Sequence, residues 1–145
     1  MYFLYSSSAG STRARRVVLS SLVQAVGSLL SIALLLLLTD SLLLVFVDTA
    51  ALFAAVGGLL GGKLPNKLLL AAAAVVNLSG IGGFLLYSLV SVFLAPEGNV
   101  LVVLLHSVVY LADVVAGCFQ FGLFFYLAFP ERSRLAASEL AESPH

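Results

Sequence analysis

The sequence contains very few charged residues. They make up 10% of the 145-residue chain, whereas hydrophobic residues make up 61%. Soluble domains are typically about 45–50% apolar and about 25% charged, so a water-soluble fold of this composition lacks the polar side chains to cover its surface. The 7 basic residues are balanced by 7 acidic ones. This lack of a basic excess argues against a nucleic-acid partner, since neutralising phosphates requires clustered Lys and Arg.

Cysteine and catalytic motifs are also scarce. The one cysteine, Cys118, lies inside an apolar run, which excludes an intrachain disulfide and a cysteine-based zinc cluster. The sequence contains no P-loop, no nucleophile elbow, no zinc-protease helix motif and no dinucleotide-binding fingerprint. We therefore expect no cofactor, no metal site and no enzymatic activity.

Long apolar stretches dominate what is present. A helix needs about 20 apolar residues to cross the roughly 30 Å hydrocarbon core, and four stretches qualify: 17–38, 42–62, 68–94 and 100–129. The connectors between them contain Asp, Asn, Pro and Gly, which favour chain reversal. The sequence thus predicts an all-α integral membrane protein, a four-transmembrane-helix antiparallel bundle. This single domain would cover residues 17–129, between an N-terminal segment 1–16 and a tail 130–145.

The basic residues predict the orientation of these spans. They occur only before the first span, in the second connector and after the last span: Arg13, Arg15, Arg16, Lys63, Lys67, Arg132 and Arg134. The first and third connectors carry only the acidic residues Asp40 and Glu97. With four spans, every basic region lies on one side, which is the positive-inside pattern. We therefore expect both the N- and the C-terminus to be cytoplasmic.

The N-terminal region resembles the basic start of a signal peptide. Its apolar run at 17–38 is longer than the usual 7–15 residues of a signal sequence and ends without a small-residue cleavage site. It is therefore interpreted as a retained anchor, most simply in the plasma (cell) membrane. The Ser-rich, acid-free stretch 1–12 leaves an organellar presequence, and hence an organellar membrane, as the alternative.

A polar stripe runs along the fourth span. His106, Tyr110, Asp113, Gly117 and Gln120 recur at spacings of 4, 3, 4 and 3, which places them on one face of a helix. This face is expected to contact protein or water. A charged side chain at mid-bilayer costs about 2.5–3.5 kcal/mol on insertion scales, so Asp113 is a functional candidate by default.

Counting about 1.5 Å per residue from the non-cytoplasmic side gives each polar residue a depth. Asp48 and His106 both lie about 9 Å deep by this count, so depth alone makes them candidates to pair. Gln24, Asn77 and Asp113 fall in the central third of the bilayer, which predicts one buried polar layer. On the first span the stripe is expected at Ser20, Gln24, Gly27 and Ser31.

Each polar residue also has a structural interpretation. Asp113 is either a proton- or cation-handling carboxylate or a carboxyl held by Gln24, Asn77 or Tyr110 to fix the helix register. His106 has no second His or Cys at ligand spacing, which favours packing over metal binding. Asp48 lies near a helix start, where a local hydrogen bond is the expected role.

Small residues form ridges on two spans. Such ridges let helices approach closely in lipid. On the second span they comprise Ala50, Ala54, Gly58 and Gly62, with a parallel pair, Gly57 and Gly61, and on the third span they comprise Ser79 and Gly83.

Three functions are weighed on this basis. The first is a non-enzymatic accessory or assembly subunit, which packs through its small-residue faces in the lipid bilayer as a homo-oligomer or within a larger membrane complex. The alternative is a small oligomeric transporter or channel that uses Asp113, with His106, Tyr110 and Gln120 lining a path. A lipid-modifying enzyme is disfavoured, because the chain has few charged residues at the interface.

Overall fold

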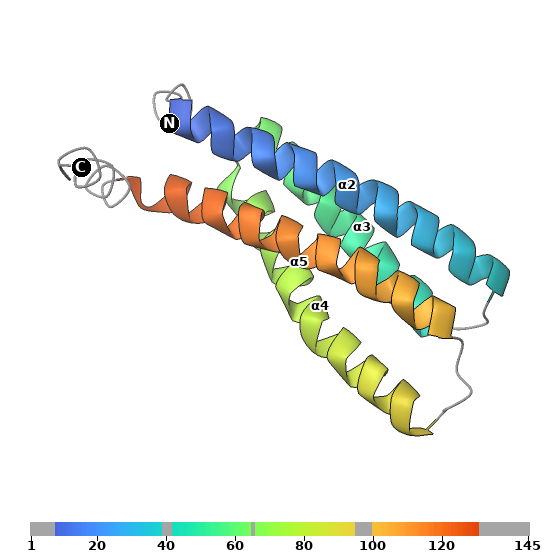
Figure 1. The fold of residues 1–145 in the computed structure, drawn as a ribbon. Coiled ribbons are helices and arrows are strands. Elements are labelled where there is room, and N and C mark those ends of the chain that lie inside the picture. The colour runs from blue at the N-terminus through green and yellow to red at the C-terminus, as the bar shows by residue number, and fades with distance from the viewer. Residues whose placement is uncertain (1–7, 39–41, 65, 95–99, 131–145) are drawn as a thin grey trace, which may run out of the picture.

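The computed structural model consists of four α-helices (Figure 1). They are α2 (Ser8–Leu38), α3 (Leu42–Lys63), α4 (Lys67–Leu94) and α5 (Val100–Ala128). The structure describes residues 8–38, 42–64, 66–94 and 100–130, and contains no strand within these ranges. The first seven residues, the predicted turns at 39–41 and 95–99, and the tail from residue 131 lie outside the described residues.

The helices begin and end where the apolar stretches of the sequence do, with one exception. Helices α3, α4 and α5 match the predicted spans to within one residue at each end. At the start of α4, the Asn66 Oδ1 accepts hydrogen bonds from the backbone N–H of Leu68 at 3.0 Å and of Leu69 at 3.4 Å, as expected of an N-cap. Helix α2, however, begins at Ser8 rather than at Val17. The apolar run marks only the part suited to lipid, and the Ala and Arg residues before it are good helix formers.

The helices form a four-cornered bundle. Helix α2 packs against α3 and α5, and α4 packs against the same two helices from the other side, so that α2 and α4 lie on one diagonal. The other diagonal joins α3 and α5, which contact each other more sparsely. Figure 1 shows α4 leading away from α2 and α5 towards its C-terminal end.

The surface of the bundle is apolar. Leu37 and Leu42 are 81% and 82% exposed, and Phe46 and Phe53 are 72% and 73% exposed. In water each would forfeit about 25 cal/mol per Å² of apolar area, whereas lipid chains solvate such side chains without this penalty. Within the described part of the chain, three stretches are long and apolar enough to span a membrane: Gly10–Leu37, Leu44–Lys63 and His106–Ala128. Helix α4 adds the shorter apolar segment Lys67–Gly80. The chain is therefore an all-helical protein with the character of an integral membrane protein.

Two hydrophobic clusters lie at the ends of the bundle, and small buried residues such as Ala54 and Ala116 lie between them. At the end where α2 begins, the cluster consists of Ala14, Val17, Leu70, Leu123, Tyr126 and Leu127. At the opposite end, Leu35 of α2 packs on Leu44 of α3. The middle of the bundle lies between these two clusters, and its interior is polar.

The small-residue ridge of α3 packs inside the chain. A Cβ added at Gly58 would overlap the Gln120 Nε2 and the Ser21 Oγ. A Cβ at Gly62 would lie 2.9 Å from the Val18 Cγ2. Both positions therefore require glycine for the close approach of α3 to its neighbours.

The other small residues of α3 also pack inside the chain, whereas those of α4 do not. On α3, a Cβ at Gly61 would lie 2.8 Å from the Leu70 Cγ, and one at Gly57 would lie 3.4 Å from the Ala73 Cβ. Ala54 is buried and Ala50 is half-buried. On α4, by contrast, Ser79 is exposed, and a Cβ at Gly83 would meet none of the described side chains within 4 Å. The ridge predicted on α4 is thus left open by this chain.

Candidate functional site

Polar side chains fill the middle of the bundle. All four helices contribute to this buried set, which comprises Ser21, Gln24, Ser28, Ser31, Asp48, Asn77, His106, Asp113 and Gln120. A polar group inside a membrane is costly unless it has a partner. The arrangement of partners therefore indicates which of these residues serve packing and which remain open to a ligand.

The best-paired part is a network of three amides. The Gln24 Nε2 donates to the Asn77 Oδ1 at 2.6 Å and to the Ala51 carbonyl at 3.1 Å. The Asn77 Nδ2 donates to the Gln24 Oε1 at 3.3 Å and to the Gln120 Oε1 at 2.9 Å. The Gln120 Nε2 donates to the Ser21 Oγ at 3.1 Å. This network joins all four helices and crosses the α2–α4 diagonal.

The sequence located most of this layer but misplaced one face. The contact between Gln24 and Asn77 agrees with their shared depth. Their third amide partner is Gln120, whereas Asp113, the third predicted member of the layer, interacts with Gln24. On α2, however, the hydroxyl that enters the network belongs to Ser21, whereas Ser20 is only half-buried and donates to the carbonyl of Val17 at 3.1 Å. Ser20 and Ser21 both continue the spacing of Gln24, so spacing alone does not choose between them.

A second polar contact crosses the other diagonal. The Asp48 Oδ2 of α3 lies 3.3 Å from the His106 Nε2 of α5, and both side chains are buried. Equal depth made these two residues candidates to pair, although a local hydrogen bond near the helix start was the expected role of Asp48. The His106 Nδ1 has no hydrogen-bond partner among the described residues, so one side of the imidazole stays available.

Asp113 is a buried acidic group of the core that is only partly satisfied. Its side chain is buried, and its Oδ1 has no hydrogen-bond partner within the described part of the chain. The side chain of Gln24 lies within interaction range of the carboxylate, which also interacts electrostatically with Asp48 and His106. The three titratable side chains of the interior therefore act on one another.

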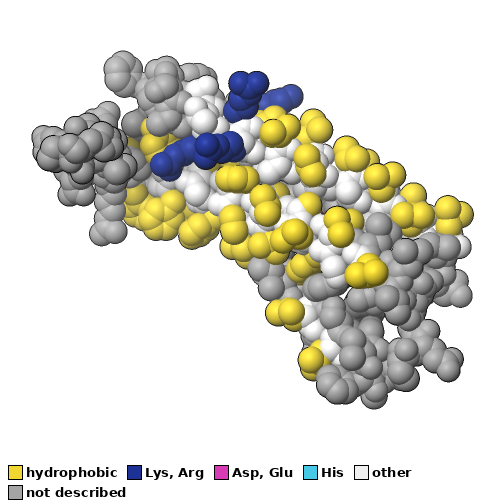
Figure 2. Space-filling view, viewed as in Figure 1, with side chains coloured by type: hydrophobic (Ala, Val, Ile, Leu, Met, Phe, Trp, Pro, Cys, Tyr) yellow, Lys and Arg dark blue, Asp and Glu magenta, His cyan; other side chains and the backbone are white. Residues whose placement is uncertain are grey.

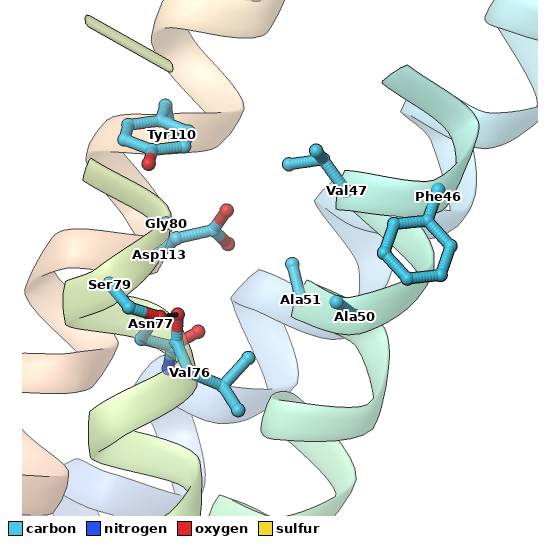
Figure 3. A pocket seen from close by; sticks show the side chains of 10 residues that line it. All are labelled: Phe46, Val47, Ala50, Ala51, Val76, Asn77, Ser79, Gly80, Tyr110 and Asp113. Atoms are coloured by element: carbon cyan, nitrogen blue, oxygen red, sulfur yellow. Dashed lines mark hydrogen bonds between the residues drawn. The ribbon is translucent and has the colours of Figure 1, made fainter. Parts of the chain in front are cut away.

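A cavity of about 160 Å³ lies between α3 and α4, with Asp113 of α5 in its wall. Figure 3 shows the Asp113 carboxylate directed from α5 towards the side of the cavity formed by Val47 and Ala51. Since a water molecule occupies roughly 30 Å³ in the liquid, the cavity can hold several waters. Phe46 and Ser79 also line it and are exposed, so the cavity opens on the outer surface between the two helices.

Tyr110 approaches the cavity from the same helix as Asp113. A Cβ added at Gly80 would lie 3.0 Å from the Tyr110 Oη, so the glycine allows the phenol to lie close to α4. Ser28 and Ser31, which are buried on α2, have hydroxyls without partners in the described chain. Ser28 was not predicted from the sequence, although it follows Gln24 at helical spacing.

These groups suit a proton, water or a small monovalent cation better than a chelated metal. Among the residues that the structure describes, no group of three or more His, Cys, Asp or Glu side chains could hold a metal ion. The oxygen atoms and the imidazole are instead dispersed along the core.

No protein-family model, no curated protein and no solved structure matches this chain. The candidate site is therefore assigned from its own geometry.

The amide network predicts a stability effect at Asn77. Replacing Asn77 by Val leaves the amides of Gln24 and Gln120 without their shared partner, and we expect the free energy of unfolding to fall by about 1–2 kcal/mol. Unfolding in mixed detergent micelles, titrated with dodecyl sulfate, measures this change. The matched control is Ser79→Ala on the same helix, because the Ser79 hydroxyl bonds to the carbonyl of Val76 in its own helix. Equal stability of the two variants would contradict the network's role.

Proposed function

We propose that the chain is a small membrane transporter or channel in which Asp113 takes up a proton or a monovalent cation. The observation that carries this proposal is the Asp113 Oδ1, which is buried, lacks a hydrogen-bond partner among the described residues and belongs to a side chain that lines a cavity opening on the bundle surface between α3 and α4. A carboxylate in this position is stabilised by a proton, by a cation or by water from the cavity. The fraction of Asp113 side chains that hold a proton or a cation therefore changes with the concentration of protons or cations.

The surrounding groups support a path on one side of Asp113. Asp48, His106, Ser28 and Ser31 continue the polar interior towards the end where α2 finishes. On the other side, the paired amides and the apolar cluster around Leu123 close the bundle. Leu35 and Leu44 cover the end where α2 finishes, so the entry to Asp113 is the lateral cavity between α3 and α4.

Asp113→Asn tests this function directly. Asn has nearly the same size but neither binds a proton nor carries a negative charge, so we expect flux to fall to the level of empty liposomes. The measurement is dye-reported proton or potassium flux in proteoliposomes that hold equal amounts of each variant. Asp40→Asn makes the same chemical change in the first connector and serves as the control. Full flux in the Asp113 variant, or no flux in the wild type under either gradient, would rule the proposal out.

The same proposal includes a membrane topology of four spans with both termini cytoplasmic. It is supported by the placement of the basic residues, since Arg13, Lys63 and Lys67 lie at one end of the bundle, where α2 begins, α3 ends and α4 begins.

Cysteine accessibility checks this topology. In a chain that carries Cys118→Ser, we expect Glu97→Cys to react with a membrane-impermeant maleimide in intact cells. Asn66→Cys, in the second connector, should react only after the membrane is permeabilised. Labelling of Asn66→Cys in intact cells would invert or discard the proposed orientation.

Assembly within a larger complex is a second candidate function, and one observation favours it. The small residues of α3 already pack against helices of the same chain. On α4, Gly82 and Gly83 have no described side chain within 4 Å of an added Cβ, and Ser79 is exposed. A helix from another subunit or from a second copy can approach such a surface closely.

Gly83→Leu tests assembly without disturbing the core. We expect the added side chain to block close helix contact and to shift the purified chain to a smaller species in native gels run in mild detergent. Ala72→Leu adds bulk at an exposed position of the same helix and should leave migration unchanged. Gly58 is unsuitable for this test, because its substitution disrupts packing within the chain. Identical migration of wild type and Gly83→Leu would count against assembly through α4.

A further inference from the structure

A long apolar groove lies on the face between α2 and α5, away from the Asp113 cavity. Its volume is about 490 Å³, and its walls are Leu19 and Val23 of α2 with Leu111, Val115 and Phe119 of α5, among others. A second hollow of about 220 Å³ adjoins it, because Arg16 and Phe119 line both. Together they form one continuous depression with an apolar body and a basic end.

The length of the groove matches one leaflet of a bilayer. On α5 it is lined from Val108 to Phe119, a rise of about 16 Å at 1.5 Å per residue. The hydrocarbon core of a bilayer is roughly 30 Å thick, so the groove covers about half of it. An acyl chain that enters beside Arg16 therefore ends near the middle of the membrane.

The basic end of the groove contains two arginines. Arg13 and Arg16 both line the smaller hollow, and within the described residues no ion pair joins either of them to an acidic side chain. The Arg13 guanidinium stacks over the Tyr126 ring, with its Cζ 4.8 Å from the ring centroid. Stacking uses the face of the guanidinium and leaves its in-plane N–H donors for oxygen acceptors.

Figure 2 shows that basic and hydrophobic side chains are separated on this surface. Hydrophobic side chains extend along the visible face, the basic side chains gather near the start of α2, and the described atoms of this face include no acidic side chain. Negative charge is therefore attracted to one end of the groove only.

We propose that this groove binds one anionic phospholipid, with an acyl chain along α2 and α5 and the phosphate at Arg13 and Arg16. Lipid chains are as apolar as the groove, so burial of the chain supplies little selectivity in a membrane. The selectivity comes from the charge of the headgroup, because each Lys or Arg near the surface strengthens the binding of anionic lipid. The site is separate from Asp113, and it depends only on the membrane character of the chain.

Lipid titration by native mass spectrometry tests the site. The full chain, purified in mild non-ionic detergent, is titrated with dioleoylphosphatidylglycerol and with dioleoylphosphatidylcholine. We expect one phosphatidylglycerol per chain, bound on the order of tenfold more tightly than phosphatidylcholine. Arg16→Gln should weaken phosphatidylglycerol binding about fivefold. Arg15→Gln is the matched control, because Arg15 neighbours Arg16 in the chain but lines neither hollow.

The groove itself is tested by filling it. Ala112 lines the groove, and Ala112→Phe should reduce phosphatidylglycerol binding, whereas Ala72→Phe on exposed α4 should not. Circular dichroism and the dodecyl sulfate titration confirm that each variant is folded. Equal binding of the two lipids, or equal loss in Arg15→Gln and Arg16→Gln, would overturn the proposal. So would an Ala112→Phe variant that binds phosphatidylglycerol normally but loses self-association, since the groove would then belong to a second copy.

Discussion

The hydrogen-bonded amides of Gln24 and Asn77 are the constraint on which the rest of the bundle depends. In lipid, no hydrophobic force draws helices together, and an unpaired amide in the interior is costly. The two side chains meet across the α2–α4 diagonal, and Gln120 completes the layer. Once this layer forms, the height and rotation of each helix are restricted. Gly58 is the steric counterpart of this constraint, since only a hydrogen at that position leaves room for Gln120.

The layer also divides the interior into two unlike halves. Towards the start of α2, apolar side chains around Val17 and Leu123 fill the core. Towards the other end, before the apolar contact of Leu35 with Leu44, the polar atoms of Asp113, Ser28 and Ser31 include several without partners in the described chain. The half that is fully paired holds the helices in register, and the half that is not fully paired adjoins the cavity. The paired packing groups and the unpaired groups beside the cavity therefore lie on different segments of the same helices.

The sequence was sufficient to predict the position of each residue along the helix axis, but not which face of each helix points inward. The ends of α3, α4 and α5 could be predicted because polarity changes sharply there, and the Asp48–His106 contact followed from depth, since the rise per residue of a helix is constant. Which face of a helix points inward depends on its neighbours. Ser20 and Ser21 differ by about 100° around the axis, and only Ser21 reaches Gln120. The outward position of Gly83 on α4 was unpredictable for the same reason.

Rotation of α2 links the core to the lipid-facing groove. Residues 14, 17, 21 and 24 are buried, and residues 13, 16, 20 and 23 line the two outer hollows. The two sets share the same spacing and differ by one residue, or about 100° around the helix. Because Gln24 holds the first set inward through its bonds to Asn77 and Ala51, it also determines that Arg13 and Arg16, and not Arg15, face the groove. The charge pattern of the surface is therefore a consequence of hydrogen bonding in the centre of the bundle, transmitted by a helix that continues without a break from Leu38 back to Ser8.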